Sequence, residues 1–237
     1  MVSKPYQQVP IKECGEALVA IPLEQFAVVA PHPYAALGAS YGDRSPYYVR
    51  ERVLAALLQA QDYLQQQQPG WRIQIFDAYR PIAVQQFMVD YTYQQLLAIW
   101  QQDHPGEMPP TEELRQQVYQ FWAAPSHDRA TPPPHSTGAA VDITLVDEKG
   151  QVVDMGSAID EISERSYPGH FADKPKGDRF HRHRLILSDA MQQTGFCQHP
   201  NEWWHFSKGD QMWAWLNSEN SKHSSDFSDV AYYGRAE

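Results

Sequence analysis

Four residues in two distant stretches of the chain could together bind a metal ion and use it for hydrolysis: His135, Asp142, Glu202 and His205. A catalytic zinc ion takes three nitrogen or oxygen ligands from the protein and leaves its fourth position for water or substrate. Two histidines and one carboxylate would supply such a set. A further carboxylate that is not a ligand can take the proton from the attacking water. The residue types therefore favour metal-assisted hydrolysis.

The first stretch is suited to a sharp turn between its two candidate ligands. Residues 125–134 include four prolines, so we expect the chain to arrive at His135 extended and not helical. Gly138 allows a close turn, and Asp142 follows on a predicted strand between two branched apolar residues. An ionised carboxylate in such a strand needs a partner if it points inward. The alternative is an edge-strand carboxylate that faces water.

The second stretch, Glu202-Trp203-Trp204-His205, is predicted to lie on a short aromatic strand over 202–207. Residues three apart lie on opposite sides of a pleated strand, so a twist or bulge is needed to aim Glu202 and His205 into one cavity. A histidine taken alone is more often a packed or solvated residue than a ligand. That ordinary alternative applies to both histidines.

Both stretches resemble the metal motifs of the peptidase family that contains the VanX-type D-alanyl-D-alanine dipeptidases. That family has two motifs: a His followed after six residues by an Asp, and, later in the chain, a Glu-x-Trp-His. Both spacings are kept here. Further similarity covers Tyr34, the string Asp77-Ala78-Tyr79-Arg80-Pro81 and the segments 155–160 and 164–166. The resemblance thus spans roughly residues 30 to 208, with the motifs in the right order.

The resemblance implies a role for each matching residue. It makes His135, Asp142 and His205 the ligands of one zinc ion per chain, Glu202 the general base, and Arg80 the cation that stabilises the oxyanion. The implied substrate is a small D,D-dipeptide such as D-alanyl-D-alanine. The residues that the resemblance assigns to substrate binding are Asp160, which would pair with the substrate ammonium, Tyr34 near it, and Ser136.

One position departs from the family pattern. Where the family has a serine two residues before the first ligand, this chain has Pro133, so a hydroxyl contact to the substrate amine is missing and the dipeptide preference stays open. Without the resemblance, Arg80 would be taken for a surface arginine at a helix start. Asp160 and Glu161 would be taken for an acidic turn.

The bulk composition describes a soluble globular chain and excludes several classes of partner. A length of 237 residues fits one domain, predicted over 1–237 with an ordered core at about 15–216 and a polar, frayed tail at 217–237. The formal charge of −10 disfavours nucleic acid and anionic membrane. Two cysteines cannot form a disulfide framework, and no signal peptide is evident, so a cytoplasmic location is the default expectation. A homo-oligomer is left open.

Helices alternate with strands in the predicted order of elements, which indicates an α+β domain with a small antiparallel sheet flanked by helices. The resemblance further implies a hedgehog-like, DD-peptidase-like fold. Apolar spacing predicts helices over 46–68, 82–102, 112–123 and 178–194. Predicted strands cover 71–76, 139–146, 151–153 and 202–207.

Other motifs give rival interpretations. Residues 38–42 match the Gly-x-Ser-x-Gly of serine hydrolases but lack the flanking strand and helix that a nucleophile elbow needs. Neither Ser-x-x-Lys nor His-Glu-x-x-His occurs. The run 181–184 of alternating His and Arg is best explained as a solvated basic face of a helix. Two further functions stay open: a D,D- or L,D-carboxypeptidase acting on peptidoglycan stem peptides, and a non-catalytic metal- or muropeptide-binding module.

Overall fold

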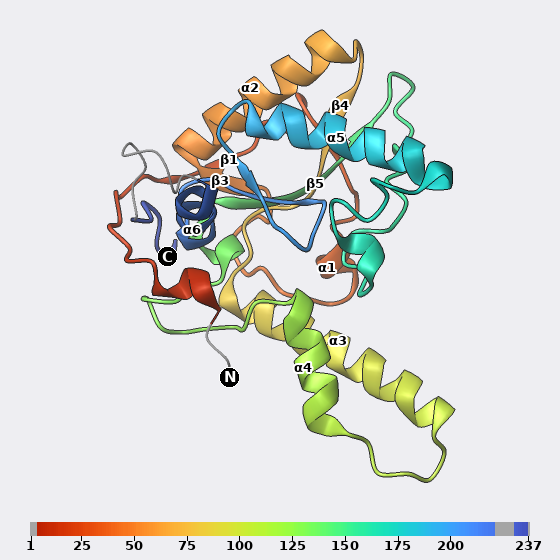
Figure 1. The fold of residues 1–237 in the computed structure, drawn as a ribbon. Helices are drawn as coiled ribbons and strands as arrows, with labels where there is room; N and C mark the ends of the chain where they lie inside the picture. The colour runs from red at the N-terminus through yellow and green to blue at the C-terminus, as the bar shows by residue number, and fades with distance from the viewer. Residues whose placement is uncertain (1–3, 221–229, 237) are drawn as a thin grey trace.

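A five-stranded sheet in the order β2-β4-β5-β7-β6 forms the centre of the molecule (Figure 1). The computed structural model of the protein describes residues 4–220 and 230–236. The strands are β2 Ala27–Val28, β4 Arg72–Asp77, β5 Ala140–Val146, β7 His205–Ser207 and β6 Cys197–Gln198. All neighbours pair antiparallel except β2 and β4, which are parallel. The α+β class expected from the sequence is confirmed.

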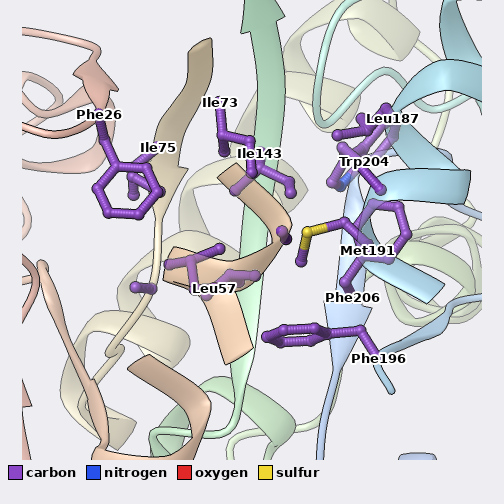
Figure 2. Close-up of a cluster of buried hydrophobic side chains, with 14 of the residues drawn as sticks. Phe26, Leu57, Ile73, Ile75, Ile143, Leu187, Met191, Phe196, Trp204 and Phe206 are labelled. Carbon is purple, nitrogen blue, oxygen red and sulfur yellow. The ribbon is translucent and has the colours of Figure 1, made fainter. Parts of the chain in front are cut away.

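One face of this sheet is covered by two helices, α2 (Glu51–Gln67) and α5 (Asp178–Gln192), which lie over it in Figure 1. The strand β4 alternates as its sequence predicts, with Ile73 and Ile75 fully buried beneath them. Figure 2 shows the side chains that meet in this core. Each such buried aliphatic side chain contributes about 1.5–3 kcal/mol. This apolar layer makes the sheet a rigid support for whatever its opposite face carries.

The helices α3 (Ile82–Asp103) and α4 (Thr111–Phe121) form a hairpin that projects from the body (Figure 1). Their bounds agree closely with the expected 82–102 and 112–123. The base of the hairpin is packed in a second apolar cluster that includes Val84, Val118 and Trp122. Tyr34 of the short helix α1 (Pro33–Ala36) belongs to the same cluster. The hairpin base therefore packs against Tyr34, one of the predicted site residues.

The helix expected over 46–68 begins later, at Glu51. Residues Tyr48–Arg50 instead form strand β3, which pairs with β1 (Leu18–Ala20) in a separate two-stranded sheet. Arg50 is buried because its guanidinium donates to the carbonyls of Thr137 and Gly234. These partners are far away in the sequence, so the local apolar spacing gave no sign of them.

Two further local expectations were wrong. Residues Pro134–Thr137 form a 3-10 turn, η2, although an extended chain was expected. Proline is accepted at the first positions of a helical turn, where its missing N–H is not needed. The return strand expected over 151–153 is reduced to an isolated bridge between Val146 and Val152. The tight turn before it is present, with the Gly150 N–H donating to the Asp147 carbonyl.

The chain ends pack against the body, so the ordered part is wider than expected. At the N-terminus, η1 (Pro5–Gln8) lies against α6 (Gln211–Asn220). Residues 230–236 are not frayed: Ala231 and Tyr233 are buried, and Ala231 pairs with Ile11. The rest of the expected tail, 221–229, lies outside the described residues. The short turns η3 (Glu164–Ser166) and η4 (Pro175–Gly177) complete the order of elements.

Among the residues at 4–220 and 230–236, no helix is long and apolar enough to cross a membrane.

Candidate active site

Three buried side chains from two strands and a turn converge on one point. His135, Asp142 and His205 offer ligand atoms that all lie within 4.8 Å of one another. Asp142 on β5 and His205 on β7 are directly opposite in the strand register, so they share one face of the sheet. Their core-side neighbours, Val141 and Phe206, point the other way into the apolar layer. The sheet pairing thus joins the two predicted stretches.

The spacing of the ligand atoms fits a tetrahedral metal. His135 Nε2 lies 3.2 Å from Asp142 Oδ2 and 3.1 Å from His205 Nδ1. His205 Nδ1 lies 3.0 Å from Asp142 Oδ1. Metal–ligand bonds near 2.0–2.1 Å at tetrahedral angles place neighbouring ligand atoms roughly 3.3 Å apart. The three residues present therefore fit a zinc ion in both chemistry and spacing.

His135 is oriented by the turn that carries it. Its Nδ1 lies 2.8 Å from the Ala78 carbonyl, so Nδ1–H donates there and Nε2 is left as the ligand atom. Gly138 closes the turn with φ +73, a left-handed conformation that glycine adopts without strain. A Cβ at Gly138 would lie 2.3 Å from a methyl of Leu18. Gly138 thus allows the close turn that was predicted, at a position where a side chain would collide with Leu18.

His205 is oriented by a second relay. Its Nε2 lies 3.3 Å from the Ser207 hydroxyl, which donates to Asp210 Oδ2 at 2.9 Å. The Nε2–H can therefore donate to Ser207, which leaves Nδ1 for a metal. Burial raises the pKa of Asp210 to about 6. Neither Ser207 nor Asp210 was predicted from the sequence, because a serine and an aspartate two and five residues after a histidine have no distinctive pattern.

Electrostatics make this point a site for a cation. Burial alone would raise the pKa of Asp142, but the charges and hydrogen bonds of His135 and His205 outweigh it and hold that pKa well below its usual range. Burial lowers the pKa of His205 and outweighs the opposing effect of the Asp142 carboxylate, which can accept a hydrogen bond from its ring. The site thus holds an ionised carboxylate next to a histidine that resists protonation, the state in which both are metal ligands.

Arg80 lies beside the candidate ligands, where hydrogen bonds and aromatic rings fix its guanidinium. Its guanidinium donates to Asp77 at 2.8 Å, Gln85 at 2.9 Å, Tyr34 at 3.1 Å and Asp142 at 3.1 Å. It also stacks between two rings, 4.8 Å from the centroid of Tyr34 and 5.1 Å from that of Trp122. Arg80 is therefore a buried cation in a fixed orientation, and not the surface arginine at a helix start that would be expected without the family resemblance.

The main anchor of Arg80 is Asp77, whose direction depends on a β-bulge. Strand β4 pairs Ile75 with Ile143, then shifts register so that Asp77 rather than Phe76 faces Asp142. The extra residue turns Asp77 away from the apolar core and toward the site. Asp77 also contacts His32 at 3.0 Å. The resemblance included Asp77 in the string that contains Arg80 but implied no role for it.

Asp160 and Tyr34 form the other wall. The Tyr34 hydroxyl donates to Asp160 Oδ2 at 2.8 Å while accepting from Arg80. Burial, followed by the nearby charge of Asp142, raises the pKa of Asp160 to about 7. Asp160 has φ +64, a strained conformation for a residue with a side chain. Asp160 is half-buried, strained and hydrogen-bonded to Tyr34, so it differs from the fully solvated acidic turn of the alternative interpretation.

Glu202 does not lie on a strand, as had been expected, because β7 begins only at His205. Residues 199–204 form a turn instead, so no pleat separates Glu202 from His205. Glu202 Oε2 lies 3.8 Å from His205 Nδ1, and Oε1 lies 3.9 Å from Nδ1 of the buried His199. Burial raises the pKa of Glu202 well above its usual range. The carboxylate thus sits beside the three ligand atoms without belonging to them.

A pocket opens between these groups. It is lined by Arg80, all three ligand residues, Asp160 and Glu202, together with residues the sequence did not indicate. The unforeseen lining residues include Lys4, Tyr6, Gln85, Trp122 and His199. Tyr34 and Ser136 are absent from the described lining: Tyr34 reaches it through Asp160, and the Ser136 hydroxyl donates to the Arg80 carbonyl at 2.8 Å. Ser136 therefore holds the backbone of Arg80.

The rival motifs have structural explanations. Gly38-Ala39-Ser40-Tyr41-Gly42 follows α1 in a loop without the strand–turn–helix of a nucleophile elbow. The run 181–184 is only partly the solvated face that was expected. Arg184 is buried and donates to the carbonyls of Met155, Tyr167 and Arg165, so it holds together the loop that precedes α5.

Comparison with known proteins identifies similar chains. A family described as D-ala-D-ala dipeptidase matches residues 28–226. A D-alanyl-D-alanine dipeptidase of Synechocystis sp. is 49% identical over 99% of this chain and 97% of its own length. One from Escherichia coli is 44% identical over 30% of this chain and 36% of its own. A structure of VanYB in complex with D-Alanine-D-Alanine is 15% identical, covers 74% of this chain and 78% of its own, and has a TM-score of 0.45.

Proposed function

Because this chain belongs to the D-ala-D-ala dipeptidase family of peptidases, we propose that it hydrolyses the peptide bond of D-alanyl-D-alanine, or of a similar small D,D-dipeptide, with one zinc ion per chain. The observation that carries the zinc dependence is the convergence of His135, Asp142 and His205 within 4.8 Å, beside a buried carboxylate that is not one of them. The ligand atoms would be His135 Nε2, His205 Nδ1 and a carboxylate oxygen of Asp142.

Zinc bound there would lower the pKa of a water molecule to about 7 and polarise the scissile carbonyl. Glu202 is the general base of the proposal: its Oε2 accepts a proton as the water oxygen attacks the carbonyl carbon. Burial favours its protonated form, and a divalent cation nearby would restore the ionised form that a base needs. The same oxygen then delivers the proton to the amide nitrogen as the C–N bond breaks.

Arg80 would stabilise the negative charge that develops on the carbonyl oxygen. Its guanidinium is fixed by Asp77, Gln85 and two aromatic rings, so little reorganisation accompanies the reaction. Arg80 also has the right protonation state at any accessible pH. Ser136 takes a positioning role, because its hydroxyl holds the Arg80 carbonyl.

Asp160 would bind the free ammonium of the substrate, with Tyr34 orienting its carboxylate. A half-buried carboxylate in the pocket lining would select a chain with a free amino terminus, since an acylated amine would leave the Asp160 charge unpaired. With Pro133 in place of a serine, no hydroxyl from that position assists. The amine recognition thus depends chiefly on Asp160.

A hydrolysis screen on the purified protein tests the proposal. Zinc-loaded protein is offered D-Ala-D-Ala, L-Ala-L-Ala and longer peptides that end in D-Ala, and the release of alanine is measured with and without a chelator. We expect zinc-dependent turnover of D-Ala-D-Ala above the others. Preferred cleavage of the longer peptides would point to a carboxypeptidase instead, and zinc binding without turnover of any peptide would point to a binding module.

A further inference from the structure

A D,D-dipeptide is a zwitterion, and the site described so far accounts for only one of its charges. Asp160 faces the ammonium end. The carboxylate at the other end also leaves water when the dipeptide is bound, and a buried carboxylate needs a cation or several donors. A cation in the pocket wall, away from Asp160, would meet that need and would fix the length of the substrate at two residues.

The described lining of the pocket contains two lysine or arginine side chains, Arg80 and Lys4. Arg80 is engaged by Asp77, Asp142, Gln85 and Tyr34, and it lies at the Asp160 end because it shares the Tyr34 hydroxyl with that carboxylate. In the proposed function its charge serves the carbonyl oxygen of the scissile bond, so the C-terminal carboxylate needs another cation.

Lys4 is the second cation of the lining. Its charge acts on the pKa values of Glu202 and His199, which line the same pocket. Among the described residues, Lys4 forms no ion pair with a carboxylate. Burial lowers the pKa of Lys4, and the Glu202 charge raises it. A cation in such surroundings gains from a second anion.

The backbone of Lys4 is anchored, although it lies close to the start of the chain. Its N–H donates to Gln7 Oε1 at 2.9 Å. The segment that follows is tied to α6 by the Gln211 amide, which donates to the carbonyls of Val9 at 2.6 Å and Gln7 at 3.4 Å. The adjoining stretch pairs with the C-terminal segment through the Lys12 N–H and the Ala231 carbonyl at 2.8 Å.

We propose that Lys4 binds the C-terminal carboxylate of the dipeptide and so determines specificity for substrates of two residues, an inference that rests on the proposed function. Asp160 and Lys4 then hold the two ends of the substrate, with the scissile bond between them at Glu202 and the metal ligands. The Lys4 side chain has four rotatable bonds and can move without unfolding its segment.

Three variants and one substrate analogue test this role. Lys4→Met removes the charge and keeps most of the length, Lys4→Arg keeps the charge, and Lys12→Met is the matched control, because Lys12 lies in the same segment with its side chain exposed and outside the described lining. The substrates are D-Ala-D-Ala and its C-terminal amide, which lacks the carboxylate charge.

We expect Lys4→Met to raise the KM for D-Ala-D-Ala about tenfold to a hundredfold, as for loss of one charge-assisted hydrogen bond, with kcat within about threefold of wild type. Wild type should prefer the acid over the amide, Lys4→Met should lose that preference, Lys4→Arg should largely keep it, and Lys12→Met should match wild type. An unchanged KM and an unchanged acid preference in Lys4→Met would overturn the role of Lys4.

A binding measurement separates this inference from the proposed function. In a Glu202→Gln background, calorimetry compares D-Ala-D-Ala and its amide with Lys4 present and replaced by Met. Tighter binding of the acid only when Lys4 is present supports the inference even if no hydrolysis is seen in wild type, a result that would count against the proposed function alone. Equal affinity for acid and amide with Lys4 present rejects it.

Discussion

Nδ1 of His205 lies 3.0 Å from Oδ1 of Asp142 because β7 pairs with β5 so that these two residues are directly opposite. Two of the three candidate ligands are thus fixed by backbone hydrogen bonds in the middle of a sheet whose other face is a packed core. The third, His135, arrives on a turn closed by Gly138. A site built on such elements keeps its geometry without the metal, so single substitutions in it should have separable effects.

Glu202→Gln should retain zinc and lose most activity. The amide keeps the size of the side chain but cannot take a proton from water, and loss of a general base costs about 10²- to 10⁴-fold in rate. Metal analysis should give one zinc per chain in both proteins, while kcat for D-Ala-D-Ala falls by that factor. Turnover within tenfold of wild type would remove Glu202 from the role of base.

His205→Ala should lose zinc as well as activity. It removes Nδ1, one of the three converging ligand atoms, and leaves the buried Asp142 with one histidine partner fewer. The matched control is His199→Ala, which removes a buried histidine of the neighbouring turn that is not in the ligand group. After dialysis, only the control should hold stoichiometric zinc and gain melting temperature when zinc is added. Equal zinc content in the two variants would contradict the ligand assignment.

An N-acetylated dipeptide should be a very poor substrate. Acetylation removes the ammonium that Asp160 would pair with and leaves a half-buried carboxylate facing a neutral amide. We expect kcat/KM to fall by at least 10²-fold relative to the free dipeptide. In Asp160→Asn the two substrates should differ much less. Comparable turnover of the blocked and free forms by wild type would show that the amine is not recognised at Asp160.

Asp160→Asn should stabilise the metal-free protein at high pH. Burial raises the pKa of Asp160 from its ordinary 3.8 to about 7, so the folded state binds this proton more tightly than the unfolded state. The contribution of the neutral carboxyl to the free energy of unfolding is fully present below about pH 4. It is lost as the pH rises toward 7, by up to about 1.4 kcal/mol for each unit by which the pKa is raised. Urea unfolding at several pH values should show that the free energy of unfolding of Asp160→Asn exceeds that of wild type by an amount that grows through this window and then levels off. A difference in unfolding free energy that does not change with pH would mean that Asp160 does not titrate in this window.

Gly138→Ala should destabilise the fold and weaken the metal site. The new methyl would need φ +73 and would lie 2.3 Å from Leu18, which must move aside. The matched control is Gly150→Ala, at φ +75 with no atom within 4 Å. The control carries only the left-handed penalty of about 1–2 kcal/mol, while Gly138→Ala adds about 1–3 kcal/mol of crowding. Equal losses in unfolding free energy would show that the crowding is relieved freely.

The sequence by itself indicated the candidate ligand set and most regular elements. The periodicities that give α3, α4, α5, β4 and β5 are local, and these helices begin directly after a proline or a glycine. His135, Asp142, Glu202 and His205 could be selected because their types and spacings are characteristic of one chemistry. Arg80 and Asp160 were selected only through the family resemblance. Taken alone, each has a commoner explanation, a surface arginine at a helix start and an acidic turn.

Tertiary structure alone decided how these residues face one another. The bulge that turns Asp77 toward Arg80 depends on strand register, and the turn that brings Glu202 beside His205 replaces a strand that the aromatic pattern had favoured. Lys4 reaches the pocket only because the start of the chain packs on α6. Register and packing depend on contacts between residues far apart in the chain, and a local pattern carries no information about such partners until the chain has folded.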